Sequence, residues 1–185
     1  YATASDFAPL VQGTRPGAAC PSFCLTYAAP SIDREERSPA VPMFVDTSPP
    51  GQCIFCRLVA GEIPSAKVYE DALTIAFMDI GQVTPGHVLV ATRRHAATLL
   101  DATPEEAAAA MQTAHHVALA VRAAFDPPGL MLLQANGALG GQTVAHFHMH
   151  VVPRHEADGI AFTWPRKEPP AAVLAGYAER LRAAL

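Results

Sequence analysis

The chain has 185 residues, of which half are hydrophobic and 16% are charged, and its formal net charge is −4. This size allows a folded domain with a proper core, and the lack of a basic block argues against duplex nucleic acid as the main partner. No apolar run approaches the length of a membrane-spanning helix, and no secretory signal is recognisable near Tyr1. We therefore expect a cytoplasmic protein that does not enter a membrane.

The first 50 residues are rich in Pro, Ala and Ser and show no sustained hydrophobic period. This composition predicts a disordered extension over residues 1–50. We expect one folded domain over residues 51–185, with its core at 53–155 and a C-terminal helical segment at 165–185. Met43 stands shortly before the ordered region, and our hypothesis is that it is the natural start.

The first half of the domain contains short elements. Residues 53–60 predict one or two helical turns that end at Gly61. The stretches 67–69 and 73–78 predict a hairpin. A Thr-Pro-Gly turn then leads into a third strand at 87–92.

The second half opens with a strong helix start, in which Thr103 is followed by Pro-Glu-Glu. This helix is expected to run to about Phe125 and to end at the Asp-Pro-Pro-Gly of 126–129. A fourth strand is predicted at 130–135, and a C-terminal helix from about Pro170. Hairpins with one long helix between them favour an α+β fold with a five-stranded, mainly antiparallel sheet.

The fifth predicted strand, residues 144–153, carries His146, His148 and His150 in alternation with apolar residues. Such alternation is typical of a half-buried strand, in which residues two apart share a face at roughly 6.6–7 Å. One strand histidine is usually structural, but packing alone does not explain three in alternation. This strand therefore indicates a functional row of imidazoles.

A glycine-rich stretch, residues 136–143, precedes that strand. Its glycines allow positive φ and close approach of the backbone to a ligand, and successive N–H groups can form an anion-binding concavity. Asn136, Gln142 and Thr143 add neutral hydrogen-bonding groups. Beside the histidines, this turn predicts a phosphate site.

The four cysteines form two pairs, and a chain of this size with a proper core needs no disulfides. Cys53 and Cys56 have the spacing of zinc ligands, although a redox pair or two buried thiols fit the same spacing. Cys20 and Cys24 lie in the Pro-rich stretch and look incidental.

Together these motifs resemble the histidine-triad (HIT) family of nucleotide-binding proteins, from Cys53 to about His155. The family implies a HIT-like fold and a homodimer in which each subunit gives five strands to one continuous sheet. It also implies cleavage of a purine nucleotide at its α-phosphate through a nucleotidyl-histidine intermediate. The motifs that carry the resemblance are Cys53-x-x-Cys56, Phe77-Met-Asp-Ile80, Thr84-Pro-Gly-His-Val-Leu-Val90, His95, Gly140-Gly-Gln-Thr-Val144 and His146-Phe-His-Met-His-Val-Val152.

On the family pattern, His148 is the nucleophile, and the backbone carbonyl of His146 orients its ring. Asp79 matches the acid that binds the ribose hydroxyls. His87 lies where the family often has a histidine, but a buried structural histidine fits equally well, and we leave it out of the catalytic set. The groups expected to hold the phosphoryl oxygens are Asn136, Gln142, Thr143 and His150. The residues expected to form the apolar purine slot are Ile54, Phe55, Leu58, Ile63, Phe77 and Ile80, although each alone is more typical of a core.

The resemblance also adds His95 and His146 to Cys53 and Cys56, as in a subset of bacterial members and in galactose-1-phosphate uridylyltransferases. A Cys₂His₂ set is expected to hold zinc in a closed, structural site. The segment before His95 reads Ala-Thr-Arg-Arg where the family usually has Ile-Pro-Lys, so the geometry of that loop stays open.

The activity that the resemblance implies is hydrolysis of nucleoside phosphoramidates. A dinucleoside polyphosphate hydrolase is the alternative, because Gly-Gln-Thr-Val and Val-Val-Pro-Arg154 resemble that branch. A third reading is a nucleotide-binding regulatory or interaction module with little turnover.

Overall fold

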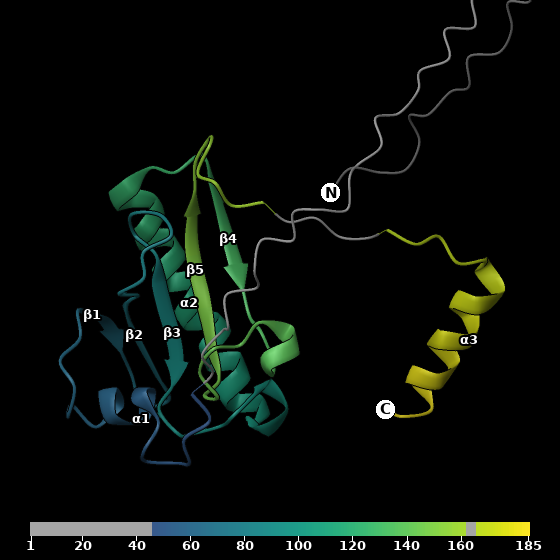
Figure 1. Ribbon diagram of the computed structural model, residues 1–185, viewed down its shortest axis with the longest axis horizontal. Helices are drawn as coiled ribbons and strands as arrows, with labels where there is room; N and C mark the ends of the chain where they lie inside the picture. Colours follow the sequence, from purple (N-terminus) through teal and green to yellow (C-terminus); the bar gives the residue numbers. More distant parts are fainter. Residues whose placement is uncertain (1–45, 162–165) are drawn as a thin grey trace, which may run out of the picture. The chain divides into compact units, whose positions relative to one another are not determined.

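The computed structural model describes residues 46–161 and 166–185. The predicted disordered extension and the hypothesis on Met43 fall almost wholly outside these residues. Five antiparallel strands form one sheet in the order β1-β2-β3-β5-β4 (Figure 1). This confirms the predicted α+β class. The strands are β1 (Lys67–Glu70), β2 (Thr74–Met78), β3 (Val88–Thr92), β4 (Gly129–Leu133) and β5 (His148–Arg154).

The β1–β2 hairpin is closed by an aspartate turn. The Asp71 carboxylate accepts hydrogen bonds from the backbone amides of Leu73 and Thr74 at 2.9 and 2.7 Å. An Asx turn of this kind holds the backbone without regular secondary structure. The hairpin confirms the strand pair predicted at 67–69 and 73–78.

The long helix α2 (Pro104–Phe125) begins where its sequence predicts. The Thr103 side chain accepts from the backbone N–H of Glu106, and the Glu106 carboxylate accepts from the backbone N–H of Thr103, which forms a capping box. The helix ends at Asp126, whose φ of 43° takes it out of the helical region. None of the described helices is long and apolar enough to cross a membrane.

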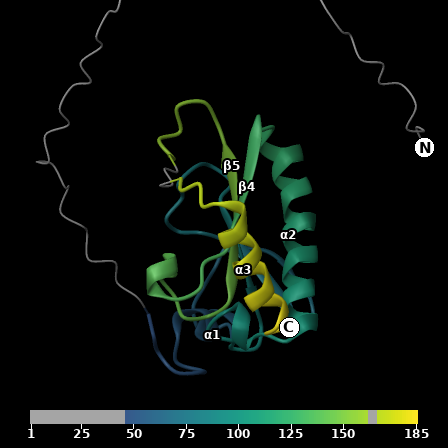
Figure 2. The same ribbon diagram turned by 90° about the vertical axis from the view of Figure 1, so that its right-hand side faces the viewer.

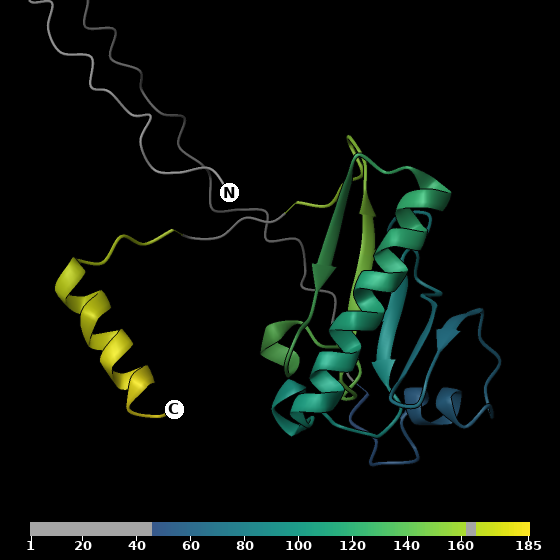
Figure 3. The same ribbon diagram turned by 180° about the vertical axis from the view of Figure 1, so that it is seen from behind.

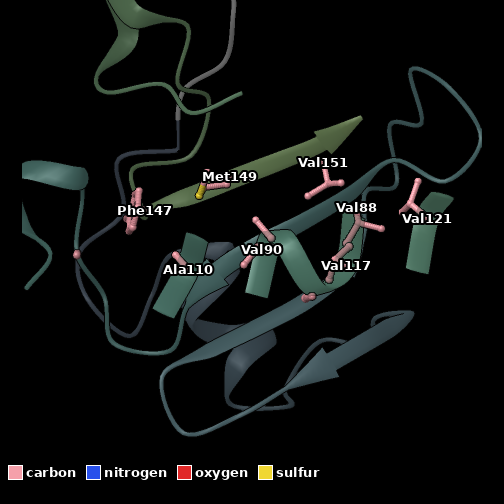
Figure 4. Close-up of a cluster of buried hydrophobic side chains, with 11 residues drawn as sticks. Val88, Val90, Ala110, Val117, Val121, Phe147, Met149 and Val151 are labelled. Atoms are coloured by element: carbon pink, nitrogen blue, oxygen red, sulfur yellow. The ribbon is translucent and has the colours of Figure 1, made fainter. Parts of the chain in front are cut away.

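Helix α2 covers one face of the sheet, as the side and rear views show (Figures 2 and 3). Apolar side chains fill the space between them (Figure 4). Along β5 and the residue before it, every second side chain enters this cluster, namely Phe147, Met149 and Val151. The predicted alternation of the histidine strand is therefore present.

The other face of the sheet carries a second, smaller cluster around the short helix α1 (Ile54–Val59). Phe55 from α1 contacts Phe77 edge to face, with ring centroids 5.4 Å apart. Because β-strand side chains alternate, Ile75 and Leu89 point to this face while their neighbours point to α2.

Strand β5 starts at His148, later than the predicted start at residue 144. The residues just before β5 bond to a loop instead of a neighbouring strand: the Phe147 amide donates to the Ala96 carbonyl at 2.6 Å. Asp46 also pairs with Val144 in an isolated bridge, a contact the sequence did not predict. Strand β4 likewise begins one residue before the predicted 130–135 and ends two residues earlier.

The C-terminal helix α3 (Ala171–Arg182) confirms the helix predicted from about Pro170. Large apolar side chains of this segment are partly or fully exposed, namely Val173, Leu174, Tyr177, Leu181 and Leu185.

Candidate active site

His148 is buried and held in one orientation at the start of β5. Its Nδ1 lies 2.6 Å from the backbone carbonyl oxygen of His146. A carbonyl can only accept, so Nδ1 carries the proton and Nε2 keeps a free lone pair. Burial lowers the pKa of His148, which favours the neutral ring at pH 7. A side chain in this state can act as a neutral nucleophile.

His148 and His150 lie at one side of a cavity of about 470 Å³. Strand register explains the remaining wall: His150 pairs with Leu89 of β3, and Leu89 pairs with Phe77 of β2. These three residues form one cross-strand row that lines the cavity. The ring of Phe55 meets His148 edge to face, with centroids 5.1 Å apart.

The predicted purine slot coincides with this cavity. Asp79 and Thr143 also line it, and Ile80 lies at its edge with a fully exposed side chain. The predicted apolar residues that line the cavity are Ile54, Phe55, Leu58, Ile63, Phe77 and Ile80.

Other lining residues escaped the sequence interpretation, namely Pro64, Ser65, Ala66, Met78, Leu89 and Val144. Leu89 could have been found from strand alternation once its pairing with His150 was known. The loop before β1 carries no motif, so its place beside the cavity follows from packing alone.

Two of the predicted phosphate ligands lie outside the cavity wall. Gln142 is buried, and its amide donates to the carbonyls of Ala97 and Val144 and accepts from the Gly137 amide. The Asn136 carbonyl oxygen accepts from the Leu99 amide, and its nitrogen donates to Gln134. The buried Gln142 thereby satisfies backbone groups around the glycine-rich loop, which need partners. Binding of phosphate by Asn136 and Gln142 stays a prediction. Thr143 remains at the cavity.

The predicted metal ligands come together on the α1 side of the sheet. The ligand atoms of Cys53, Cys56, His95 and His146 all lie within 4.8 Å of one another. The sulfur-to-Nδ1 distances are 3.3–3.6 Å, close to the roughly 3.6 Å of a tetrahedral zinc site. The two sulfurs are 3.2 Å apart and would have to open to about 3.8 Å around zinc.

The second nitrogen of His146 supports this arrangement. Nε2 lies 2.7 Å from the Thr92 carbonyl oxygen, so it carries the proton and Nδ1 faces the thiols with a lone pair. Burial lowers the pKa of His146 to about 4, which keeps the ring neutral. The donor set and its protonation therefore fit a zinc ion.

The unusual Arg-Arg segment before His95 has a structural role. The Arg94 guanidinium donates two hydrogen bonds, of 2.7 and 2.6 Å, to the buried Glu106 carboxylate at the start of α2. Such a bidentate pair needs the planar fork of arginine. It ties the loop that carries His95 to the capping box of α2.

A second polar side chain, that of His87, contacts His150. His87 is buried, and its Nε2 is 3.0 Å from the Nδ1 of His150. Its other nitrogen faces Asp79 at 3.6 Å. The backbone around both residues is held by Gln82, which donates to the carbonyls of Asp79 and His87 and accepts from the His87 amide.

Comparison with known proteins agrees with this geometry. The family model of the HIT domain matches residues 60–157. Protein hit of Bacillus subtilis is 46% identical over 113 residues, which are 60% of this chain and 78% of that protein. A Schizosaccharomyces pombe protein named adenosine 5′-monophosphoramidase hnt1 is 37% identical over 61% of this chain and 83% of its own length.

Solved structures give the same assignment. The crystal structure of a HIT family protein from Bacillus anthracis superposes with a TM-score of 0.71 and 38% identity, over 74% of this chain and 99% of that one. A zinc-bound histidine triad family protein from Mycobacterium smegmatis has a TM-score of 0.57 and 32% identity, over 72% and 98% of the chains. Fold, site and sequence together define a histidine-triad protein: the chain belongs to the HIT family.

Proposed function

We propose that this protein hydrolyses purine nucleoside phosphoramidates through a covalent nucleotidyl-His148 intermediate. The orientation of His148 carries the proposal: Nδ1 is bound to the His146 carbonyl at 2.6 Å, and the ring lies at an apolar cavity with its other nitrogen free. A neutral imidazole in this state can attack phosphorus without a metal. The name of the Schizosaccharomyces pombe relative supports the same chemistry.

The residues of the cavity suggest how the substrate is held. The apolar wall around Phe55 and Phe77 suits a flat base, and Asp79 suits the ribose hydroxyls. Thr143 and His150 line the cavity and can hold the phosphoryl oxygens, where hydrogen-bond donors stabilise the charge of the transition state. Nε2 of His148 forms a bond to phosphorus as the P–N bond breaks, the departing amine takes a proton, and water then releases the nucleotide.

We further propose that Cys53, Cys56, His95 and His146 hold a structural zinc ion. The ion would join the N-terminal end of α1, which carries Phe55 of the cavity, to the residue whose carbonyl orients His148. It would supply rigidity and take no part in the reaction itself. The zinc-bound relative from Mycobacterium smegmatis supports this assignment.

We also infer a homodimer that pairs through β4. This strand lies at an edge of the sheet, where unpaired backbone groups favour addition of another strand. Its side chains Leu130, Leu132 and Leu133 are 37–40% exposed. The variant Leu132→Glu should be monomeric by light scattering at concentrations where the wild type is dimeric. A monomeric wild type would contradict the inference.

Intact-protein mass spectrometry tests the mechanism. Turnover of adenosine 5′-phosphoramidate is quenched in alkali, in which phosphohistidine bonds survive. We expect an adduct of the mass of AMP on the wild type and on the exposed control His115→Ala, but none on His148→Ala, whose turnover should fall roughly 10³-fold or more.

The remaining outcomes separate the alternatives. Full turnover by His148→Ala would mean that the nucleophile is another residue. If the wild type cleaves diadenosine polyphosphates but no phosphoramidate, the dinucleoside polyphosphate hydrolase is favoured. Binding of AMP without turnover of either substrate would favour a regulatory module.

A further inference from the structure

His87 is the one buried group beside the cavity that the proposed reaction leaves without a role. Its side chain is almost fully buried, one nitrogen lies 3.0 Å from His150, and the other has no hydrogen-bond partner among the described residues. That unbonded nitrogen, Nδ1, faces the Asp79 carboxylate at 3.6 Å. A buried nitrogen without a hydrogen-bond partner lowers the stability of a fold, so a purely structural histidine would not be expected in this position.

The three side chains are also poorly arranged for a metal ion, although Asp79, His87 and His150 lie close enough to be considered as ligands. The two ring nitrogens meet in hydrogen-bond geometry at 3.0 Å, so each points directly at the other. Two imidazoles that share a zinc ion at about 2.0–2.1 Å must instead direct both lone pairs at a third point. The pair is therefore better described as a path for a proton.

The contacts among Asp79, His87 and His150 limit where their protons can lie. If His150 is to donate from Nε2 to a phosphoryl oxygen, its Nδ1 must accept, and Nε2 of His87 must be the donor. Nδ1 of His87 would then set a lone pair against the Asp79 carboxylate unless it too carries a proton. The state that satisfies all three groups is a His87 cation between Asp79 and His150.

In the ligand-free site this cation is disfavoured. Burial lowers the pKa of His87, and burial lowers the pKa of His150 to about 4, with the neighbouring His148 and His87 acting in the same direction. The charge of Asp79 raises both pKa values, and the backbone of Gly81 also raises that of His87. A bound phosphate adds a second negative charge beside His150, which shifts the balance toward protonation.

We propose that His87 is a positioning residue that stores the proton which His150 delivers to the leaving group. Phosphate binding brings in one proton, which is held on His87. As the P–N bond breaks, the Nε2 proton of His150 moves to the departing amine, and the Nε2 proton of His87 moves to Nδ1 of His150. His87 ends neutral with its Nδ1 proton toward Asp79, and the attack of water on the intermediate reverses both transfers.

The proposal rests on the proposed function and gives Asp79 a second part. Asp79 lines the cavity, where it is available to ribose hydroxyls, and it also faces His87. Recognition of the sugar and storage of the proton would then share one carboxylate.

Calorimetry of AMP binding tests the storage step without any turnover. Titrations at one pH in buffers of different ionisation enthalpy give the number of protons taken up per site. The key variant is His87→Gln, because glutamine can place an N–H donor near His150 but cannot hold an extra proton. We expect the wild type and the exposed control His115→Gln to take up about one proton more per site than His87→Gln.

Kinetics with two leaving groups test the delivery step. An alkylamine must be protonated to depart, whereas p-nitrophenolate needs no proton. For the adenosine alkylphosphoramidate we expect kcat of His87→Gln to fall about 10- to 100-fold with little change in KM. For adenosine 5′-(p-nitrophenyl phosphate) the same variant should stay within about threefold of the wild type. The unfolding midpoint of each variant checks that the fold is kept.

Several outcomes would overturn the proposal. Equal proton uptake by the wild type and His87→Gln, or an equal loss of kcat on both substrates, would assign His87 a structural role. A second metal ion per chain that disappears in His87→Gln would make the cluster a metal site. Proton uptake that depends on His87 in a protein without turnover would leave the proton store intact and refute the hydrolase. Failure of AMP to bind would refute both.

Discussion

On the side that faces α2, β5 and the residue before it give Phe147, Met149 and Val151 to a hydrophobic cluster. On the opposite side the same stretch gives His146, His148 and His150 to a set of polar contacts. The first side is stabilised by shape and area, which many aliphatic combinations can provide. The second side is defined by individual donors and acceptors and their particular partners.

This contrast between the two sides predicts which substitutions the molecule tolerates. A change of volume on the α2 side should alter the free energy of unfolding and spare the chemistry, because no polar contact of the site passes through it. A change on the histidine side should alter the chemistry at little cost in stability, provided that no buried polar group loses its partner.

The largest expected effect on stability tests the α2 side. Phe147→Ala should lower the free energy of unfolding by about 3–5 kcal/mol, because the ring is fully buried and a cavity remains. Chemical denaturation measures this value, and kcat per folded molecule should stay within about tenfold of the wild type. The volume-conserving control Met149→Leu should cost less than about 1.5 kcal/mol. A loss of kcat as large as in His148→Ala would show that the two sides are not independent.

Removal of the proposed zinc ion should have an effect of intermediate size, and it should act on the histidine side. The proposed zinc ligands join α1 to His146, so a chelator should lower the unfolding midpoint and raise KM for the nucleotide. The free energy of unfolding should fall by about 3 kcal/mol relative to the protein in zinc at some 100-fold above its Kd. Thermal unfolding with and without chelator measures it, beside the zinc content per chain. Cys56→Ser should be insensitive to chelator, and a wild type equally insensitive would contradict a zinc site.

A smaller effect is expected where the two sides meet, at the pair of Arg94 and Glu106. The Arg94 guanidinium holds the pKa of the Glu106 carboxyl below its usual value. A carboxyl with a lowered pKa stabilises the fold above its ordinary pKa of about 4.3, and this contribution disappears as the pH falls through the folded value. Glu106→Gln keeps the capping box, so it should cost about 1–2 kcal/mol at pH 7.

Thermal unfolding across pH checks the sign of this prediction. The difference between the wild type and Glu106→Gln should be largest at neutral pH and should shrink toward zero in acid. The exposed neighbour provides the control, and Glu105→Gln should change little at any pH. A difference that persists undiminished in acid would assign the stabilisation to packing instead of charge.

Features that depend on neighbours in sequence were determined by the sequence alone. The capping box at Thr103, the hairpin at Asp71 and the alternation of the histidine strand are local, because each follows from contacts over two to four residues. Because the HIT motifs are short contiguous stretches, the resemblance could also be recognised from the sequence. It also placed His148 two residues from the carbonyl that orients it.

The tertiary structure decided which distant groups meet, although the meeting of the metal ligands was expected beforehand from the family resemblance. Cys53 contacts His146 across 93 positions, and His87 meets His150 across 63. Gln142 was predicted to bind phosphate, yet its amide is bound by backbone groups of its own loop and of residue 97. The sequence shows which hydrogen-bond donors and acceptors a chain has, but not which of them pair. Packing decides the pairs, because each buried donor or acceptor bonds the partner that the fold places beside it.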